Sequence, residues 1–213
     1  MQTSLPVVEY QHSKKKGRTP MMKDLVRKSR SWRGYDESRR ISKEELLEFV
    51  DCARFAPSSV NGQPFQYVLA WKKEDVDRIQ PLTGWARALP QMKLPHPGKC
   101  PTAFVIICQN TEWDPDLGRY TRDLGAVAQT MLLAATEAGL GGIMIGNFSP
   151  DRVRTTLELP EKLQPMLIVA FGKPDETIVL TEVGEGESLK YYRDGNDVHY
   201  VPKRRLQDVT VEL

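Results

Sequence analysis

Two groups of cations in this sequence could bind a negatively charged ligand. Arg30, Ser31 and Arg33 place two guanidinium groups and a hydroxyl within four residues. A second group lies near the end of the chain, at Lys203, Arg204 and Arg205. A guanidinium can bind two phosphate oxygens at once, whereas a lysine acts as a point charge. Both groups are therefore typical of a phosphate site, although surface ion pairs use the same residue types.

Between these cations lie a polar segment and two stretches with glycine. The polar segment begins at Pro57 and carries four side chains that can donate and accept hydrogen bonds: Ser58, Ser59, Asn61 and Gln63. Gly141-Gly142 and Gly146-Asn147 would let the backbone approach a planar ligand closely, because glycine has no Cβ. Any one of these stretches alone could be an ordinary turn. Together with the cations they favour a pocket for a flat, polar and anionic ligand.

The sequence lacks the motifs of side-chain catalysis. It has no Gly-x-Gly-x-x-Gly or Gly-Lys-Ser/Thr phosphate loop, no Gly-x-Ser-x-Gly nucleophile elbow and no residues at metal-ligand spacing. Its three histidines are scattered and offer little for a catalytic triad. If the protein is an enzyme, we expect a bound cofactor to supply the chemistry.

Composition indicates a globular protein of the reducing cytoplasm. A chain of 213 residues with 40% hydrophobic residues is long enough to bury one substantial core. No apolar run reaches the roughly 18–20 residues that would span a membrane, and the polar N-terminus does not resemble a secretory signal. Three cysteines without Cys-x-x-Cys spacing are typical of unpaired thiols.

Positive charge is concentrated at the start of the chain. The net charge is only +2, but residues 1–33 carry nine Lys and Arg and two acids. We expect residues 1–20 to be a loosely ordered extension and residues 21–213 to form a single domain. A nucleic-acid-binding arm at Lys14-Lys15-Lys16 is an alternative, but no aromatic residue alternates with these lysines. We therefore expect neither a nucleic-acid nor a membrane partner.

Hydrophobic periodicity predicts a mixed set of helices and strands. Helices are predicted at Met22–Ser29, from the capping box Ser42-Lys43-Glu44-Glu45 to before Pro57, at Asp75–Gln80, at Tyr120–Gly139 and from Ser149 to about Leu159. Strands are predicted at Phe65–Trp71, at Ala103–Gln109, from Gly141 and at Met166–Phe171, the last ended by Gly172-Lys173-Pro174. This mixed α/β pattern lacks the strict strand–helix alternation of a doubly wound fold.

Residues 81–101 form a proline-rich interruption that holds five prolines. Loops of this length are usually functional or disordered. The apolar residues Trp85, Leu89 and Met92 favour a lid or a segment that covers a subunit interface. Trp85 or Met92 could contact a substrate, or could equally pack in a dimer.

Four motifs in this order resemble the nitroreductase family of FMN-dependent NAD(P)H oxidoreductases. They are Arg-Ser-Trp-Arg-Gly-Tyr at 30–35, Ala-Arg-Phe-Ala-Pro-Ser-Ser-Val-Asn-Gly-Gln-Pro-Phe at 53–65, Ala-Gly-Leu-Gly-Gly-Ile-Met-Ile-Gly at 138–146 and Val-Pro-Lys-Arg-Arg-Leu at 201–206. The C-terminal part is similar to a bacterial branch without an assigned substrate. The resemblance implies an α+β fold with a mixed, mainly antiparallel central sheet flanked by helices. It also implies a homodimer in which the C-terminal segment extends onto the partner subunit.

The resemblance further implies a role for each motif at an FMN site shared by two subunits. Arg30 and Ser31 would hold the phosphate end, and Arg33 would lie near N1 and the C2 carbonyl of the flavin. The partner's polar segment would line the pyrimidine and the ribityl chain, through Pro57, Ser58, Ser59, Asn61 and Gln63. The glycine stretch would place Gly142 at the site and the backbone of Gly146 and Asn147 near N5. The phosphate clamp would be completed by Lys203, Arg204 and Arg205. One departure is Ser29, where many family members carry a basic residue.

The implied activity is hydride transfer from NADH or NADPH through flavin N5 to nitroaromatic or quinone-like acceptors, in a ping-pong cycle without a side-chain acid or base. Two alternatives remain open at this stage. One is a flavin-binding storage module without turnover, and the other is a relative with different flavin chemistry, such as dehalogenation or dehydrogenation.

Overall fold

The computed structural model describes residues 22–213, which divide into two compact units, residues 22–175 and Glu176–Leu213. The expectation for residues 1–20 lies outside the described residues. That residues 21–213 form one functional domain stays a prediction. None of the helices in the described part of the chain is long and apolar enough to cross a membrane.

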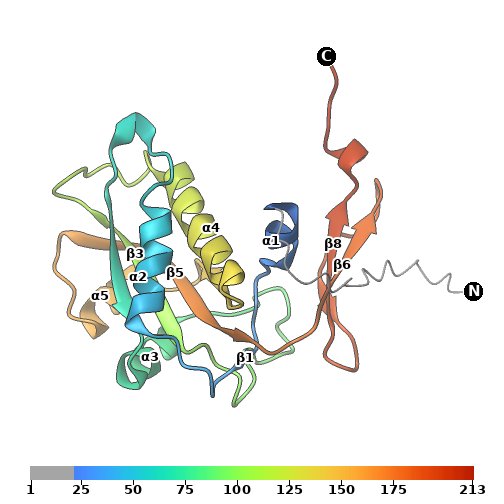
Figure 1. Cartoon of the computed structure of the whole chain (residues 1–213), viewed down its shortest axis with the longest axis horizontal. Helices are drawn as coiled ribbons and strands as arrows, with labels where there is room; N and C mark the ends of the chain where they lie inside the picture. Colours follow the sequence, from blue (N-terminus) through green and yellow to red (C-terminus); the bar gives the residue numbers. More distant parts are fainter. Residues whose placement is uncertain (1–21) are drawn as a thin grey trace, which may run out of the picture. The chain divides into compact units, whose positions relative to one another are not determined.

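The first unit is built on a central five-stranded sheet (Figure 1). Its strands are β1 (Tyr35–Asp36), β2 (Phe65–Ala70), β3 (Ala103–Asn110), β4 (Gly141–Ile145) and β5 (Leu163–Pro174). The order is β1-β5-β3-β2, β4 also pairs with β5, and all these ladders are antiparallel. One parallel bridge joins Ser31 to Gly142. The predicted mixed, mainly antiparallel sheet is therefore confirmed.

Five α-helices and two short 3₁₀ helices accompany this sheet. They are α1 (Met22–Lys28), α2 (Lys43–Ala53), α3 (Lys73–Ile79), α4 (Thr121–Glu137) and α5 (Pro150–Thr156), with η1 at Ser59–Asn61 and η2 at Gln80–Leu82. The capping box that starts α2 is present: the Glu45 amide donates to Ser42 Oγ at 3.2 Å, and the Ser42 amide donates to Glu45 Oε2 at 2.9 Å. The helix α4 ends as predicted before Gly139, which has φ +73°.

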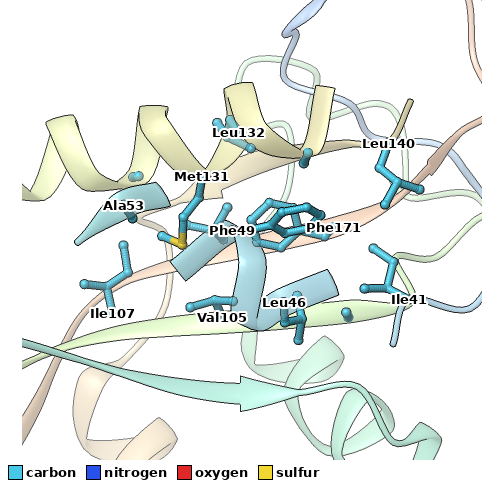
Figure 2. Packing of buried hydrophobic residues seen from close by; sticks show 14 of the residues in the cluster. Ile41, Leu46, Phe49, Ala53, Val105, Ile107, Met131, Leu132, Leu140 and Phe171 are labelled. Atoms are coloured by element: carbon cyan, nitrogen blue, oxygen red, sulfur yellow. The ribbon is translucent and has the colours of Figure 1, made fainter. Parts of the chain in front are cut away.

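Helices cover both faces of the sheet, so each face has its own apolar cluster. On one face, Leu46 and Phe49 of α2 and Met131 of α4 pack against Val105 and Phe171 of the sheet (Figure 2). On the other face, a second cluster joins α3 and α5 to the opposite side of the same strands, through Val76, Ile79, Phe104, Ile106, Val153 and Ile168. Strand side chains alternate between faces, so β3 is buried along its whole length. This explains its nearly continuous apolar sequence.

The predicted end of the fifth strand is wrong. Gly172-Lys173-Pro174 does not terminate the strand, because β5 continues to Pro174. The short strand β1 extends the ladder there, with Tyr35 opposite Pro174 and Asp36 opposite Lys173. Gly172 is needed for close packing, since a Cβ at this residue would lie 2.6 Å from Cδ1 of Tyr35.

The second unit, Glu176–Leu213, is a three-stranded sheet. It contains β6 (Ile178–Val183), β7 (Tyr192–Arg193) and β8 (His199–Arg204) in the order β6-β8-β7, followed by the 3₁₀ helix η3 (Leu206–Asp208). The strand β8 is parallel to β6 and antiparallel to β7. An ion pair between Arg193 and Glu176 is almost completely buried in this unit.

Candidate functional site

The cationic segment after α1 lies against the start of strand β4. Ser31 forms a parallel bridge with Gly142, and the Trp32 amide donates to the Gly142 carbonyl at 3.2 Å. The Tyr35 hydroxyl donates to the Trp32 carbonyl at 2.8 Å. These bonds fix the backbone of residues 30–33, so its side chains project from a defined position on the first unit.

The two arginines of this segment are partly or largely removed from water. Arg30 Nη2 donates to the Val26 carbonyl at 2.7 Å, while Arg30 Nε is buried and has no hydrogen-bond partner among the described residues. Burial lowers the pKa of Arg30, although an arginine remains protonated in proteins. Arg33 is 9% exposed and donates to the Ser31 carbonyl at 3.0 Å. An unsatisfied donor on a half-buried cation favours an anionic acceptor beside it. The donor set therefore fits a phosphate or another anionic ligand.

The lack of a side chain has different consequences at Gly142, in β4, and at Gly146, which follows the strand. A Cβ on Gly142 would lie 2.4 Å from the Ala170 carbonyl oxygen and 2.7 Å from Cδ2 of Leu132, so packing between β5 and α4 requires glycine there. Gly146, just beyond the strand, is exposed, and a Cβ on it would meet no atom within 4 Å. The backbone at Gly146 is consequently open to a ligand. At Gly142, other atoms of the protein occupy the space beside the backbone.

Asn147 joins the end of β4 to the proline-rich segment. The Gly84 amide donates to the Asn147 carbonyl at 2.7 Å. A Cβ on Gly84 would lie 1.9 Å from Asn147 Nδ2, so the Asn147 side chain rests directly on Gly84. The neighbouring Trp85 donates from Nε1 to Thr83 Oγ1 at 2.7 Å and packs against the α3–α5 cluster. The segment 81–101 thus begins beside Gly146 and Asn147.

The polar segment after Pro57 is held by a carboxylate that the sequence analysis did not single out. Ser58 Oγ donates to Asp123 Oδ2 at 2.8 Å, and the Ser59 amide donates to the same oxygen at 2.7 Å. Asp123 lies in the first turn of α4 and is 8% exposed. Its position four residues before buried Val127 places it on the buried side of the helix, a periodic signal that could have identified it.

The two polar groups of the first unit lie at different places along α4. The segment after Pro57 is attached at Asp123, whereas Gly142, which pairs with Ser31, packs beside Leu132. Nine residues of helix at 1.5 Å each separate these points by about 14 Å. Within one chain, therefore, Ser58–Gln63 and Arg30–Arg33 do not form one continuous cluster (Figure 1).

The C-terminal cations belong to the second unit. Lys203 and Arg204 lie in β8, and Arg205 precedes η3. All three are exposed, and Lys203 is opposite Glu182 in the parallel ladder. Because Lys203 and Arg204 are adjacent in a strand, their side chains point to opposite faces of the sheet.

The described residues include neither an activated cysteine nor a cluster of metal-ligating side chains. Burial raises the pKa of Cys108 to about 12, and burial also raises the pKa values of Cys52 and Cys100. These thiols are therefore protonated at neutral pH and weakly nucleophilic. No group of three or more His, Cys, Asp or Glu residues in the described part could hold a metal ion.

The chain matches the Nitroreductase family over residues 26–173, and it belongs to this family. This confirms the resemblance carried by the sequence motifs. The matched range ends before the second unit and so does not include Lys203, Arg204 or Arg205.

Individual relatives agree with this assignment. A protein of Archaeoglobus fulgidus, an inferred NADH dehydrogenase/NAD(P)H nitroreductase, is 25% identical over 161 residues, covering 71% of this chain and 84% of the relative. A nitroreductase family protein from Clostridium difficile has a TM-score of 0.56 at 27% identity, covering 71% of this chain and 83% of that chain. A protein from Exiguobacterium sibiricum, an inferred nitroreductase solved in complex with FMN, has a TM-score of 0.62 over 74% of this chain and 90% of that chain. At 19% identity this last likeness shows the fold alone.

Proposed function

We propose that this protein is an FMN-dependent NAD(P)H oxidoreductase of the nitroreductase type. The observation that carries the proposal is the arrangement of β4. Its first residues pair with Ser31, between the cations Arg30 and Arg33, and its last residue leads into the open backbone at Gly146. A ligand with an anionic end and a flat polar end would find a partner for each along one strand. Family membership and the relative inferred to be an NAD(P)H nitroreductase support the same activity.

The residues of the first unit take separate roles toward the cofactor. Arg30 and Ser31 would hold the phosphate, which supplies the acceptor that buried Arg30 Nε lacks. Arg33 would stabilise negative charge near N1 and the C2 carbonyl, because a fixed cation in a partly desolvated position interacts strongly with developing charge. The amides of Gly146 and Asn147 would face N5. Bound FMN would accept a hydride from NADH or NADPH at N5 and pass it to a nitroaromatic or quinone-like acceptor after the nicotinamide has left.

A homodimer would complete the site. The separation of about 14 Å along α4 supports it, because Arg30–Arg33 and Ser58–Gln63 would then serve different flavins in the two shared sites. The partner's polar segment would contribute Pro57, Ser58, Ser59, Asn61 and Gln63. The C-terminal unit would extend onto the partner and add Lys203 and Arg205 to the phosphate clamp, with Arg204 beside them. Gly142 would act mainly through packing. We place this dimer in the cytoplasm.

Flavin content tests this site assignment directly. We expect the double variant Arg33→Ala/Lys203→Ala to purify without flavin colour, because it loses the cation proposed to lie near flavin N1 and one cation of the phosphate clamp. A matched control is Lys73→Ala/Lys162→Ala, which removes the same charge from two exposed ion pairs, with Asp77 and Glu112. Such pairs contribute little to stability. Full flavin occupancy in the first variant would show that the cations are wrongly assigned.

A further inference from the structure

A chain of hydrogen bonds starts at Asp123 and runs through the polar segment 58–63. Ser58 Oγ and the Ser59 amide both donate to Asp123 Oδ2, at 2.8 and 2.7 Å. Ser58 Oγ in turn accepts from the Gln63 amide at 3.0 Å. Gln63 Nε2 then donates to Asn61 Oδ1 at 2.9 Å. A single carboxylate on α4 thus anchors both ends of a segment that lies 60 to 65 residues earlier in the chain, the far end through Ser58 Oγ.

The Ser58 hydroxyl donates its only proton to Asp123 within this network. A serine hydroxyl has one donor and two acceptor positions. Since the donor is used by Asp123, Ser58 can only accept a hydrogen bond from a ligand. Donors toward a ligand must come from its neighbours, such as the side-chain nitrogen Nδ2 of Asn61, because the Asn61 backbone N–H already donates to the Ser58 carbonyl at 2.9 Å.

The segment itself has a backbone that requires outside support. Val60, Asn61 and Gln63 have φ values of +47°, +55° and +46°, in the left-handed region that residues with a Cβ seldom adopt. Three such residues within four positions persist only where surrounding contacts hold them. Tyr120 covers the segment from one side, because a Cβ on Gly62 would lie 2.2 Å from its hydroxyl oxygen.

Asp123 has no ion-pair partner among the described residues, although it is 8% exposed. Two features compensate for its burial. It accepts two hydrogen bonds from the segment, and it occupies the first turn of α4, where the helix dipole stabilises negative charge. The carboxylate and the segment therefore depend on each other.

We propose that Asp123 is a positioning residue for flavin binding, which orders the segment 58–63 through Ser58 and so sets the affinity for FMN. Asp123 acts on the ligand only through the segment and has no part in hydride transfer. This proposal rests on the proposed function, because it assumes that the segment lines a flavin site.

A double-mutant cycle tests the link between the two residues in the full-length protein. The variants are Asp123→Asn, Ser58→Ala and the double variant, each measured by amide hydrogen exchange without flavin and by quenching of FMN fluorescence on binding. We expect each single variant to speed exchange of the Ser59 and Gln63 amides and to weaken FMN binding about tenfold, the effect of losing about one charge-assisted hydrogen bond. The double variant should weaken binding much less than the product of the single effects.

Two further variants separate positioning from general damage. Ser58→Thr keeps the hydroxyl, and its extended backbone (φ −125°, ψ 141°) accommodates a β-branched residue, so exchange and FMN affinity should return to within about twofold of wild type. Ser38→Ala removes an exposed hydrogen bond of the same type, from Ser38 Oγ to Asp36 Oδ1 at 2.6 Å, and should leave both measurements unchanged.

The outcomes that overturn the proposal are specific. Exchange and affinity within twofold of wild type in Asp123→Asn, or fully multiplicative effects in the double variant, would contradict the link. If Asp123→Asn fails to fold, Ser58→Ala against Ser58→Thr still decides it. If the wild-type protein binds no FMN, the proposed function fails, and the exchange data alone then show whether Asp123 orders the segment.

Discussion

Gly84 and Asn147, 63 residues apart, meet through both backbone and side chain. The Gly84 amide donates to the Asn147 carbonyl at 2.7 Å, and the Asn147 side chain occupies the space where a Cβ of residue 84 would stand. The start of the proline-rich segment 81–101 is thereby fixed beside the residues proposed to face N5. A change in this segment can reach the reactive end of the site through one contact.

Gly84→Ala should slow reduction of the bound flavin. The new Cβ would lie 1.9 Å from Asn147 Nδ2 and 3.0 Å from the Asn147 carbonyl oxygen, so Asn147 must move. We expect stopped-flow reduction by NADH or NADPH to be about tenfold slower, since small misplacements at a reacting centre have effects of this order or larger. The control is Gly118→Ala, whose Cβ would meet only Asp116 Oδ1 at 3.4 Å. Equal rates in the two variants would show that the contact is unimportant for the reaction.

Phe49→Ala should strongly destabilise the first unit. Phe49 and Phe171 are buried with their ring centroids 5.3 Å apart, and they link α2 to the sheet beneath α4 (Figure 2). Removing a buried phenylalanine ring typically costs about 3–5 kcal/mol. Urea unfolding followed by circular dichroism measures the loss, and Phe49→Leu should lose distinctly less. A loss of less than about 1 kcal/mol in the free energy of unfolding would show that this ring pair contributes little to the stability of the first unit.

Local rules predicted much of the first unit. The capping box is formed by Ser42 and Glu45, which are three residues apart, and a run of apolar side chains predicts β3. Both features can be predicted without knowledge of distant partners. The cationic and glycine motifs were likewise found from residue type and spacing. The structure places Ser31 beside Gly142 and leaves Gly146 open, but assigns Gly142 a packing role.

Features that depend on distant partners were missed. The strand β5 continues through Pro174 because β1 pairs with it, although Gly172-Lys173-Pro174 resembles a terminator. The half-buried strand β6 (Ile178–Val183) was not predicted, since its partner β8 lies some twenty residues later in parallel. Asp123 escaped notice because its importance comes from Ser58, 65 residues away. In each case the deciding contact is long-range.

Glu45 of the capping box should make the free energy of unfolding depend on pH in the acidic range. The Arg39 guanidinium, and after it the Ser42 amide, lower the pKa of the Glu45 carboxyl. A carboxyl with a lowered pKa stabilises the fold above its unfolded pKa of about 4.3, and this contribution disappears as pH falls through the folded value. Urea titrations at pH 7 and below about pH 4 should therefore show a smaller pH dependence in Glu45→Gln than in wild type. The control is Glu44→Gln, an exposed acid in the same helical turn. Unchanged pH dependence in Glu45→Gln would contradict this role.

The buried ion pair of the second unit should be costly to break from one side. Arg193 and Glu176 have side chains only 2% and 4% exposed. Arg193→Met would take the guanidinium away from the buried Glu176 carboxylate, at a cost of about 3–5 kcal/mol, whereas the pair Arg193→Met/Glu176→Leu should recover most of the stability. Amide hydrogen exchange in β8 reports the opening of this unit. If Arg193→Met leaves that exchange unchanged, the pair does not hold the sheet that carries Lys203.

Anaerobic reduction of the flavin-loaded protein tests the central claim most directly. We predict that NADH or NADPH bleaches the flavin absorbance band of the purified protein, and that a nitroaromatic or quinone-like acceptor then restores it. A ping-pong cycle would also give parallel lines in double-reciprocal plots at varied acceptor concentration. A yellow protein whose band never bleaches with either nicotinamide would contradict the oxidoreductase and indicate a flavin-binding module without turnover.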